Sequence, residues 1–197
     1  MTTGLKARQI TLLGLLTAIL LLMSFTPLGY LHVGPLALTL NMIPVAVAAA
    51  CLGPVGGIVT GTVFGLTSFL QAMGIGGGSP LGTALFSLSP LRCFFMCVGP
   101  RVLTGLLTGL SGRLVPHRVM PYFAGLCAAF FNTALFMGAM ILLYGSTDYV
   151  RAMIAGRNLF VFVCTFVGFQ AITEMVASTA ITGVIVRGLE RARMLER

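Results

Sequence analysis

The chain has 197 residues, of which 57% are hydrophobic and 8% are charged, and its formal net charge is +8. Because soluble domains carry about 25% charged residues and the mean hydropathy here is +1.03, the composition excludes a soluble globular protein. The basic residues stand at the ends of apolar segments and are not interleaved with aromatic residues, so they indicate membrane orientation and exclude nucleic acid as a partner.

Apolar runs of span length recur along the whole chain. Since one span needs about 20 apolar residues, the length leaves room for six spans with short connections. We therefore predict an all-α integral membrane protein, a six-helix bundle embedded in the lipid bilayer, in which residues 1–197 form a single transmembrane domain.

The first half of the chain predicts three helices. The first is expected over Gln9–Phe25, and the second, a short one, over Met42–Leu52. The glycines and the proline of Gly53–Gly57 predict a tight turn, after which a third helix runs to about Ala72. The apolar segment Val33–Leu40, between the first two helices, is interrupted by glycine and proline, so we expect it to be extended and to face outward.

The second half predicts three more helices and two polar loops. Helices are expected over Leu91–Leu114, Tyr122–Tyr144 and Asn158–Leu189. The glycine-rich stretch Gly74–Ser89 precedes the first of these and is predicted to be a mobile loop rather than a helix. A second polar loop is expected over Gly145–Arg157.

The distribution of lysine and arginine predicts the orientation of the bundle. With the N-terminus inside, eight basic residues fall on the inner face: Lys6, Arg8, Arg113, Arg118, Arg187, Arg191, Arg193 and Arg197. Three fall on the outer face: Arg92, Arg151 and Arg157. The asymmetry predicts a multi-pass plasma membrane protein with both termini in the cytoplasm. Both polar loops then lie outside, where they could cover an outward-facing pocket.

Small residues recur every four positions in three predicted helices: Gly14 and Ala18, then Gly57, Gly61 and Gly65, then Gly105 and Gly109. This spacing lets helix backbones approach closely in lipid. For the glycines of the third helix we expect packing inside the bundle. For Gly14 and Ala18, internal packing and a lipid-exposed surface that docks on another membrane protein both stay open.

Arg101 and Glu174 are the charged residues placed deepest in apolar segments. Charge within a membrane is costly and normally faces the bundle interior or a cavity. Gln170 lies one helical turn before Glu174 on the same face, and for this pair we favour contact with a polar ligand over a structural role. For Arg101 both roles stay open.

Other polar residues occupy the faces of predicted helices. Phe64, Ser68 and Gln71 share one face, which suits either a ligand with apolar and polar parts or aromatic packing with the glutamine at the headgroups. Asn132 needs a hydrogen-bonding partner in lipid, either a neighbouring helix or a ligand. An anionic ligand would also need a cation, for which the candidates are Arg92, Arg101, Arg151 and Arg157.

Catalytic and metal-binding motifs are missing from the sequence. The four acidic residues form no close pair, and neither a Gly-x-Ser-x-Gly nor a His-Glu-x-x-His motif occurs. We expect no enzyme activity, no cofactor and no metal site. The sequence also lacks a phosphate-binding loop, so the energy for any transport must come from another subunit or from an ion gradient.

Five stretches, in this order and spacing, resemble the S components of energy-coupling factor (ECF) transporters. They are Leu38–Val45, Leu52–Gly57, Phe64–Phe69, Phe86–Pro90 and Pro100–Gly109. The similarity covers nearly the whole chain. The Ile-Pro-Val, Phe-Gly-x-x-Ser-Phe and Phe-Ser-x-x-Pro pieces are most similar to the pantothenate group, although the riboflavin, folate, cobalamin and pyridoxine groups share much of the pattern.

The resemblance implies six helices around an outward-facing pocket that captures one vitamin. It also implies an ABC-type importer, in which the chain docks on a separate membrane T subunit driven by two ATPase subunits. The Ala-x-x-x-Ala docking motif of the family becomes Gly14-x-x-x-Ala18 here. The alternatives are a stand-alone ion-driven carrier, against which the absence of repeated halves counts, and a structural or assembly subunit.

Overall fold

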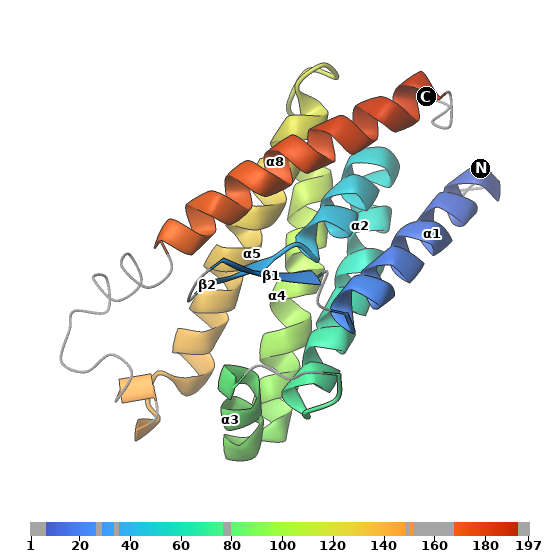
Figure 1. Cartoon of the computed structure of the whole chain (residues 1–197). Helices are drawn as coiled ribbons and strands as arrows, with labels where there is room; N and C mark the ends of the chain where they lie inside the picture. Colours follow the sequence, from blue (N-terminus) through green and yellow to red (C-terminus); the bar gives the residue numbers. More distant parts are fainter. Residues whose placement is uncertain are drawn as a thin grey trace.

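A computed structural model of the chain describes residues 7–26, 29–33, 36–76, 80–148, 150–151 and 168–192. These residues form six α-helices and one small β-hairpin, and both ends of the chain lie at the same end of the bundle (Figure 1). Five of the helices are long and apolar enough to cross a membrane, which confirms the predicted class. The helices are α1 (Ala7–Ser24), α2 (Met42–Ala72), α3 (Pro80–Leu88), α4 (Pro90–Ser111), α5 (Met120–Tyr144) and α8 (Gly168–Arg191).

Helix α2 is bent back on itself at Gly53, so it consists of two arms, residues 42–52 and 54–72. Gly53 has φ 68° and ψ −155° inside an otherwise helical element, a conformation that glycine adopts without steric cost. A Cβ atom at Gly56 would lie 2.6 Å from the carbonyl oxygen of Ala48, which only a reversal of the chain can produce. The two predicted helices are therefore confirmed, but the turn between them is one residue long, because Pro54 already begins the second arm.

The hairpin between α1 and α2 is the exception to the predicted all-α fold. Strands β1 (Tyr30–Val33) and β2 (Leu36–Thr39) pair antiparallel, with Tyr30 opposite Thr39. The N–H group of Leu40 donates to the carbonyl oxygen of Gly29 at 3.0 Å and closes the base of the hairpin. The extended conformation predicted for this segment is thus confirmed, whereas its outward orientation stays a prediction.

Helix α3 lies in the stretch that was predicted to be a mobile loop, so that prediction was wrong. Leu85 is fully buried, and the ring of Phe86 packs edge-on against Phe69 of α2 with centroids 5.8 Å apart. The hydroxyl of Tyr144, at the end of α5, donates to the carbonyl oxygens of Leu85 and Ser89 at 3.0 Å. Burial of one apolar face and these tertiary bonds outweigh the low helix propensity of the surrounding glycines.

The remaining predicted boundaries agree with α1, α4 and α5 within a few residues. The sixth predicted helix is described from Gly168 onward, and its first ten residues, 158–167, lie outside the described part of the chain. Most of the second predicted loop, including Arg157, lies outside it as well.

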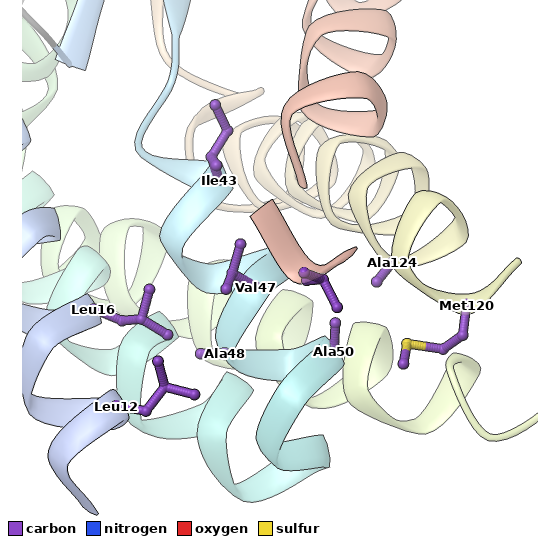
Figure 2. Close-up of a cluster of buried hydrophobic side chains, with 9 residues drawn as sticks. Leu12, Leu16, Ile43, Val47, Ala48, Ala50, Met120 and Ala124 are labelled. Atoms are coloured by element: carbon purple, nitrogen blue, oxygen red, sulfur yellow. The ribbon is translucent and has the colours of Figure 1, made fainter. Parts of the chain in front are cut away.

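Three apolar clusters follow one another along the bundle. At the end that carries the termini, side chains of α1, the first arm of α2, α5 and α8 meet, among them Leu12, Val47 and Met120 (Figure 2). Leu20, Phe64 and Ala128 belong to a second cluster, and the third, around Leu85 and Tyr144, lies at the opposite end.

Helix α4 is in direct backbone contact with the second arm of α2. The contact follows the glycines spaced four residues apart, Gly57, Gly61, Gly65 and Gly105, which we call the glycine seam. A Cβ atom at Gly57 would overlap the carbonyl oxygen of Gly105, and one at Gly105 would overlap that of Gly57. Gly61 lies in the same way against the backbone of Arg101, and Gly65 against Val98. The prediction that these glycines pack inside the bundle is confirmed.

We expect the single methyl group added by Gly105→Ala to force α2 and α4 apart and to destabilise the protein by about 1–3 kcal/mol. The measurement is the thermal unfolding midpoint of the purified protein in detergent. Gly99→Ala is the matched control: it adds the same group to the same helix, where nothing lies within 4 Å, and alanine favours a helix by about 0.5–1 kcal/mol. A midpoint for Gly105→Ala at or above that of Gly99→Ala would contradict the close contact.

Candidate functional site

Arg101 is a buried cation in the middle of α4, between two aromatic rings. Its side chain is 9% exposed, and its Cζ atom lies 5.4 Å from the ring centre of Phe64 and 4.3 Å from that of Phe136. One guanidinium nitrogen donates to the carbonyl oxygen of Met96 at 3.3 Å. Cation–π contacts at these distances stabilise a desolvated guanidinium, so α2, α4 and α5 together hold a positive charge inside the bundle.

Polar side chains near this cation are buried without a hydrogen-bonding partner among the described residues. They include the hydroxyl of Thr104, one turn along α4 from Arg101, and the amide oxygen of Asn132, one turn before Phe136 on α5. Directly before α2, beside Gly29, both side-chain amide atoms of Asn41 are also buried without a hydrogen-bonding partner in the described part of the chain. Buried polar groups are nearly always paired with protein or water. The interior here thus suits ordered water or a polar ligand.

Glu174 joins α8 to the hairpin. The residue is buried, with 7% of its surface exposed, and its carboxylate accepts the backbone N–H of Thr39 at 2.8 Å. Gly125 of α5 packs against the backbone at Ser178 of α8, and the helices run antiparallel (Figure 1). With a rise of about 1.5 Å per residue, Asn132 is therefore roughly level with residue 171, one turn from Glu174. Gln170 lies on the same helix, but its side chain is outside the described part.

The second-arm face that carries Phe64, Ser68 and Gln71 is directed toward α1 as well as toward Arg101. Gln71 is buried, and its side-chain nitrogen donates to the carbonyl oxygen of Ser24 at the end of α1. Ser68 is half-buried. Gln71 therefore has a hydrogen-bonding partner inside the protein. Ligand contact by Ser68 and Gln71 stays a prediction.

The other candidate cations lie elsewhere. Arg92 is exposed at the start of α4, where its guanidinium donates to the carbonyl oxygen of Leu143 at 3.5 Å. Nine residues of helix separate it from Arg101, which is about 13 Å along the axis. Arg151 is also exposed. Of the described candidates, Arg101 alone is buried within the bundle.

Gly14 and Ala18 lie on the exposed face of α1. The opposite face carries Leu12, Leu16 and Leu20, which are buried. Nothing lies within 4 Å of a Cβ atom built at Gly14. The spacing therefore serves no packing within the described chain, which leaves the surface accessible to another membrane protein.

The structure brings Phe64 and Arg101 together and adds Phe136 and Thr104, which were not predicted as site residues. Asn41 is a further buried polar residue that was not predicted. Phe136 and Thr104 occur in apolar runs, where a single aromatic residue or threonine does not indicate a binding site. Asn41 does stand out in the sequence as an amide between apolar residues. Its burial could be inferred only once the hairpin and the first arm of α2 were placed.

Comparison with known proteins agrees with this architecture. The profile of the family described as "ECF transporter, substrate-specific component" matches residues 8–186. The pantothenic acid transporter PanT of Lactococcus lactis subsp. cremoris (strain MG1363) is 25% identical over an alignment of 212 positions, which covers 95% of this chain and 96% of that protein. Because the family profile spans nearly all of the bundle, the chain belongs to the substrate-specific components of ECF transporters.

Proposed function

We propose that this chain captures pantothenate within the bundle and delivers it through a T subunit energised by two ATPase subunits. The proposal for the vitamin is supported by the similarity to PanT over almost the whole chain and by the residues that surround Arg101. Pantothenate carries a carboxylate, an amide and hydroxyl groups. A guanidinium next to buried amide and hydroxyl groups offers complementary chemistry to each of them.

The observation that carries the proposal is the burial of Arg101 between Phe64 and Phe136. An intramembrane charge is retained where it serves a ligand, an ion path or a structural pair. Arginine binds a carboxylate with two parallel hydrogen bonds, and the neighbouring Thr104 and Asn132 have hydrogen-bonding capacity to spare. We therefore assign Arg101 as the anchor for the carboxylate, in preference to the exposed Arg92.

Replacing Arg101 with glutamine should weaken pantothenate binding at least about tenfold, since a hydrogen bond to a charged group contributes about 1.5–3 kcal/mol and 1.4 kcal/mol is tenfold. Calorimetric titration of the purified chain measures this. A second test changes the ligand: pantothenol is the analogue of pantothenate in which an alcohol replaces the carboxylate. The wild type should prefer pantothenate strongly, whereas Arg101→Gln should bind the two compounds about equally.

Arg191→Gln, at the far end of α8, is the matched control and should bind pantothenate like the wild type. Thermal unfolding midpoints of all variants establish that they are folded. An unchanged preference for pantothenate over pantothenol in Arg101→Gln would exclude Arg101 as the anchor. If Arg92→Gln loses that preference instead, the carboxylate lies at the start of α4 and not in its middle.

The exposed strip of α1 is proposed as the surface that docks on the T subunit. Gly14→Trp or Ala18→Trp should abolish co-purification with the T subunit and ATPases, because close backbone approach requires small residues. Vitamin binding by the isolated chain should persist, since the strip faces away from Arg101. Val176→Trp, at an exposed position on α8, is the control. Loss of vitamin binding in the α1 variants would indicate internal packing.

Both termini are proposed to lie in the cytoplasm, on the basis of the lysine and arginine distribution. His117 lies in the connection before α5 and Arg151 in the segment after it, so the length of α5 separates the two. In intact cells a membrane-impermeant maleimide should label Arg151→Cys, whereas His117→Cys should react only after permeabilisation. Comparison with the wild type corrects for the native cysteines, and the reverse labelling pattern would overturn the orientation.

A further inference from the structure

The connection between α4 and α5 is fixed to the C-terminal part of α8 by a small charged network. A guanidinium nitrogen of Arg187 donates to the carbonyl oxygen of Arg118, and the other contacts the carboxylate of Glu190 at 3.1 Å. The imidazole Nε2 of His117 lies 3.4 Å from the second oxygen of Glu190. His117 and Arg187 thus contact different oxygen atoms of the Glu190 carboxylate, and Arg187 also holds the backbone of the connection in place.

The same end of the bundle has positive charge left over. Arg113, Arg118 and Arg191 are exposed, and among the described residues no carboxylate forms an ion pair with any of them. Glu190 is the only acidic residue that the described chain places at this end, and it is already engaged. Within the described residues, the surface therefore presents guanidinium groups that no carboxylate of this end pairs with.

Two exposed apolar side chains stand next to these arginines. Leu114, beside Arg113, is 83% exposed, and Val119, beside Arg118, is 50% exposed. The connection directly follows the last residue of α4, so it lies where a membrane-spanning helix leaves the hydrocarbon. Alternating cationic and apolar side chains at that depth match the boundary between phosphate headgroups and acyl chains.

We propose that the connection between α4 and α5 is a binding site for anionic phospholipid, independent of substrate capture. Arg113 and Arg118 bind the phosphate of the headgroup, and Leu114 and Val119 contact the adjoining acyl chains. An acidic protein partner would satisfy the arginines but would leave the exposed leucine without an apolar environment. A lipid satisfies both kinds of side chain at once.

The test uses the full chain in nanodiscs that contain equal amounts of phosphatidylglycerol and phosphatidylcholine. The protein is then extracted in neutral detergent, and the lipid that stays bound is quantified by mass spectrometry. The wild type should retain phosphatidylglycerol preferentially. The double variant Arg113→Gln/Arg118→Gln should lower that enrichment at least about fivefold, which corresponds to the effect of one basic residue near an anionic surface.

Two further variants make the result specific. Arg113→Lys/Arg118→Lys keeps the charge and should keep most of the enrichment, whereas Arg92→Gln/Arg151→Gln removes two exposed charges at the opposite end and should leave it intact. Unfolding midpoints establish that each variant is folded. The proposal is overturned by a wild type without lipid preference, or by an equal loss in the opposite-end variant. It is also overturned if the Arg113/Arg118 glutamine variant retains phosphatidylglycerol but no longer co-purifies with the T subunit.

Discussion

The second arm of α2 and α4 touch backbone to backbone, and the position of Arg101 depends on that contact. In lipid, apolar side chains gain nothing from leaving their surroundings, so helices associate through close packing and hydrogen bonds. Gly57 and Gly105 provide the close packing, and Gly61 lies directly against the backbone of Arg101. The Cα atom of Arg101 is thereby fixed next to α2, and its side chain extends between Phe64 of α2 and Phe136 of α5.

Several groups of the protein stabilise this buried cation. The two rings contribute cation–π energy of about 2 kcal/mol or more when desolvated, and the carbonyl oxygen of Met96 accepts one hydrogen bond. Nearby Thr104 and Asn132 have buried oxygen atoms without partners in the described chain. A ligand with a carboxylate and hydroxyl groups would satisfy these groups together. Under the proposed function, part of the free energy of binding therefore comes from hydrogen bonds between the ligand and these buried oxygen atoms.

The sequence predicted the long helices because their apolar runs match the thickness of a bilayer, and it predicted the glycine seam because close packing in lipid requires small residues at fixed spacing. Helix α3 was not predictable in this way, since its stability comes from Phe69 and Tyr144, which are distant in the chain. Arg101, Phe64 and Asn132 were already candidates from the sequence. Arg101 is conspicuous in an apolar run, whereas the importance of Phe136 and Thr104 follows from helix packing alone.

Helix α1 relates the proposed docking surface to the candidate site. Gly14 and Ala18 are exposed on one face, while Leu20 on the other packs in the same cluster as Phe64, whose ring adjoins Arg101. At the end of the helix, the carbonyl oxygen of Ser24 accepts the side chain of Gln71. Helix α1, about 10 Å in diameter, thus lies between a partner docked on its exposed face and the cluster that contains Phe64. Under the proposed function, a shift of α1 on docking would act on Phe64 and Gln71 first, before any change could reach α5 or α8.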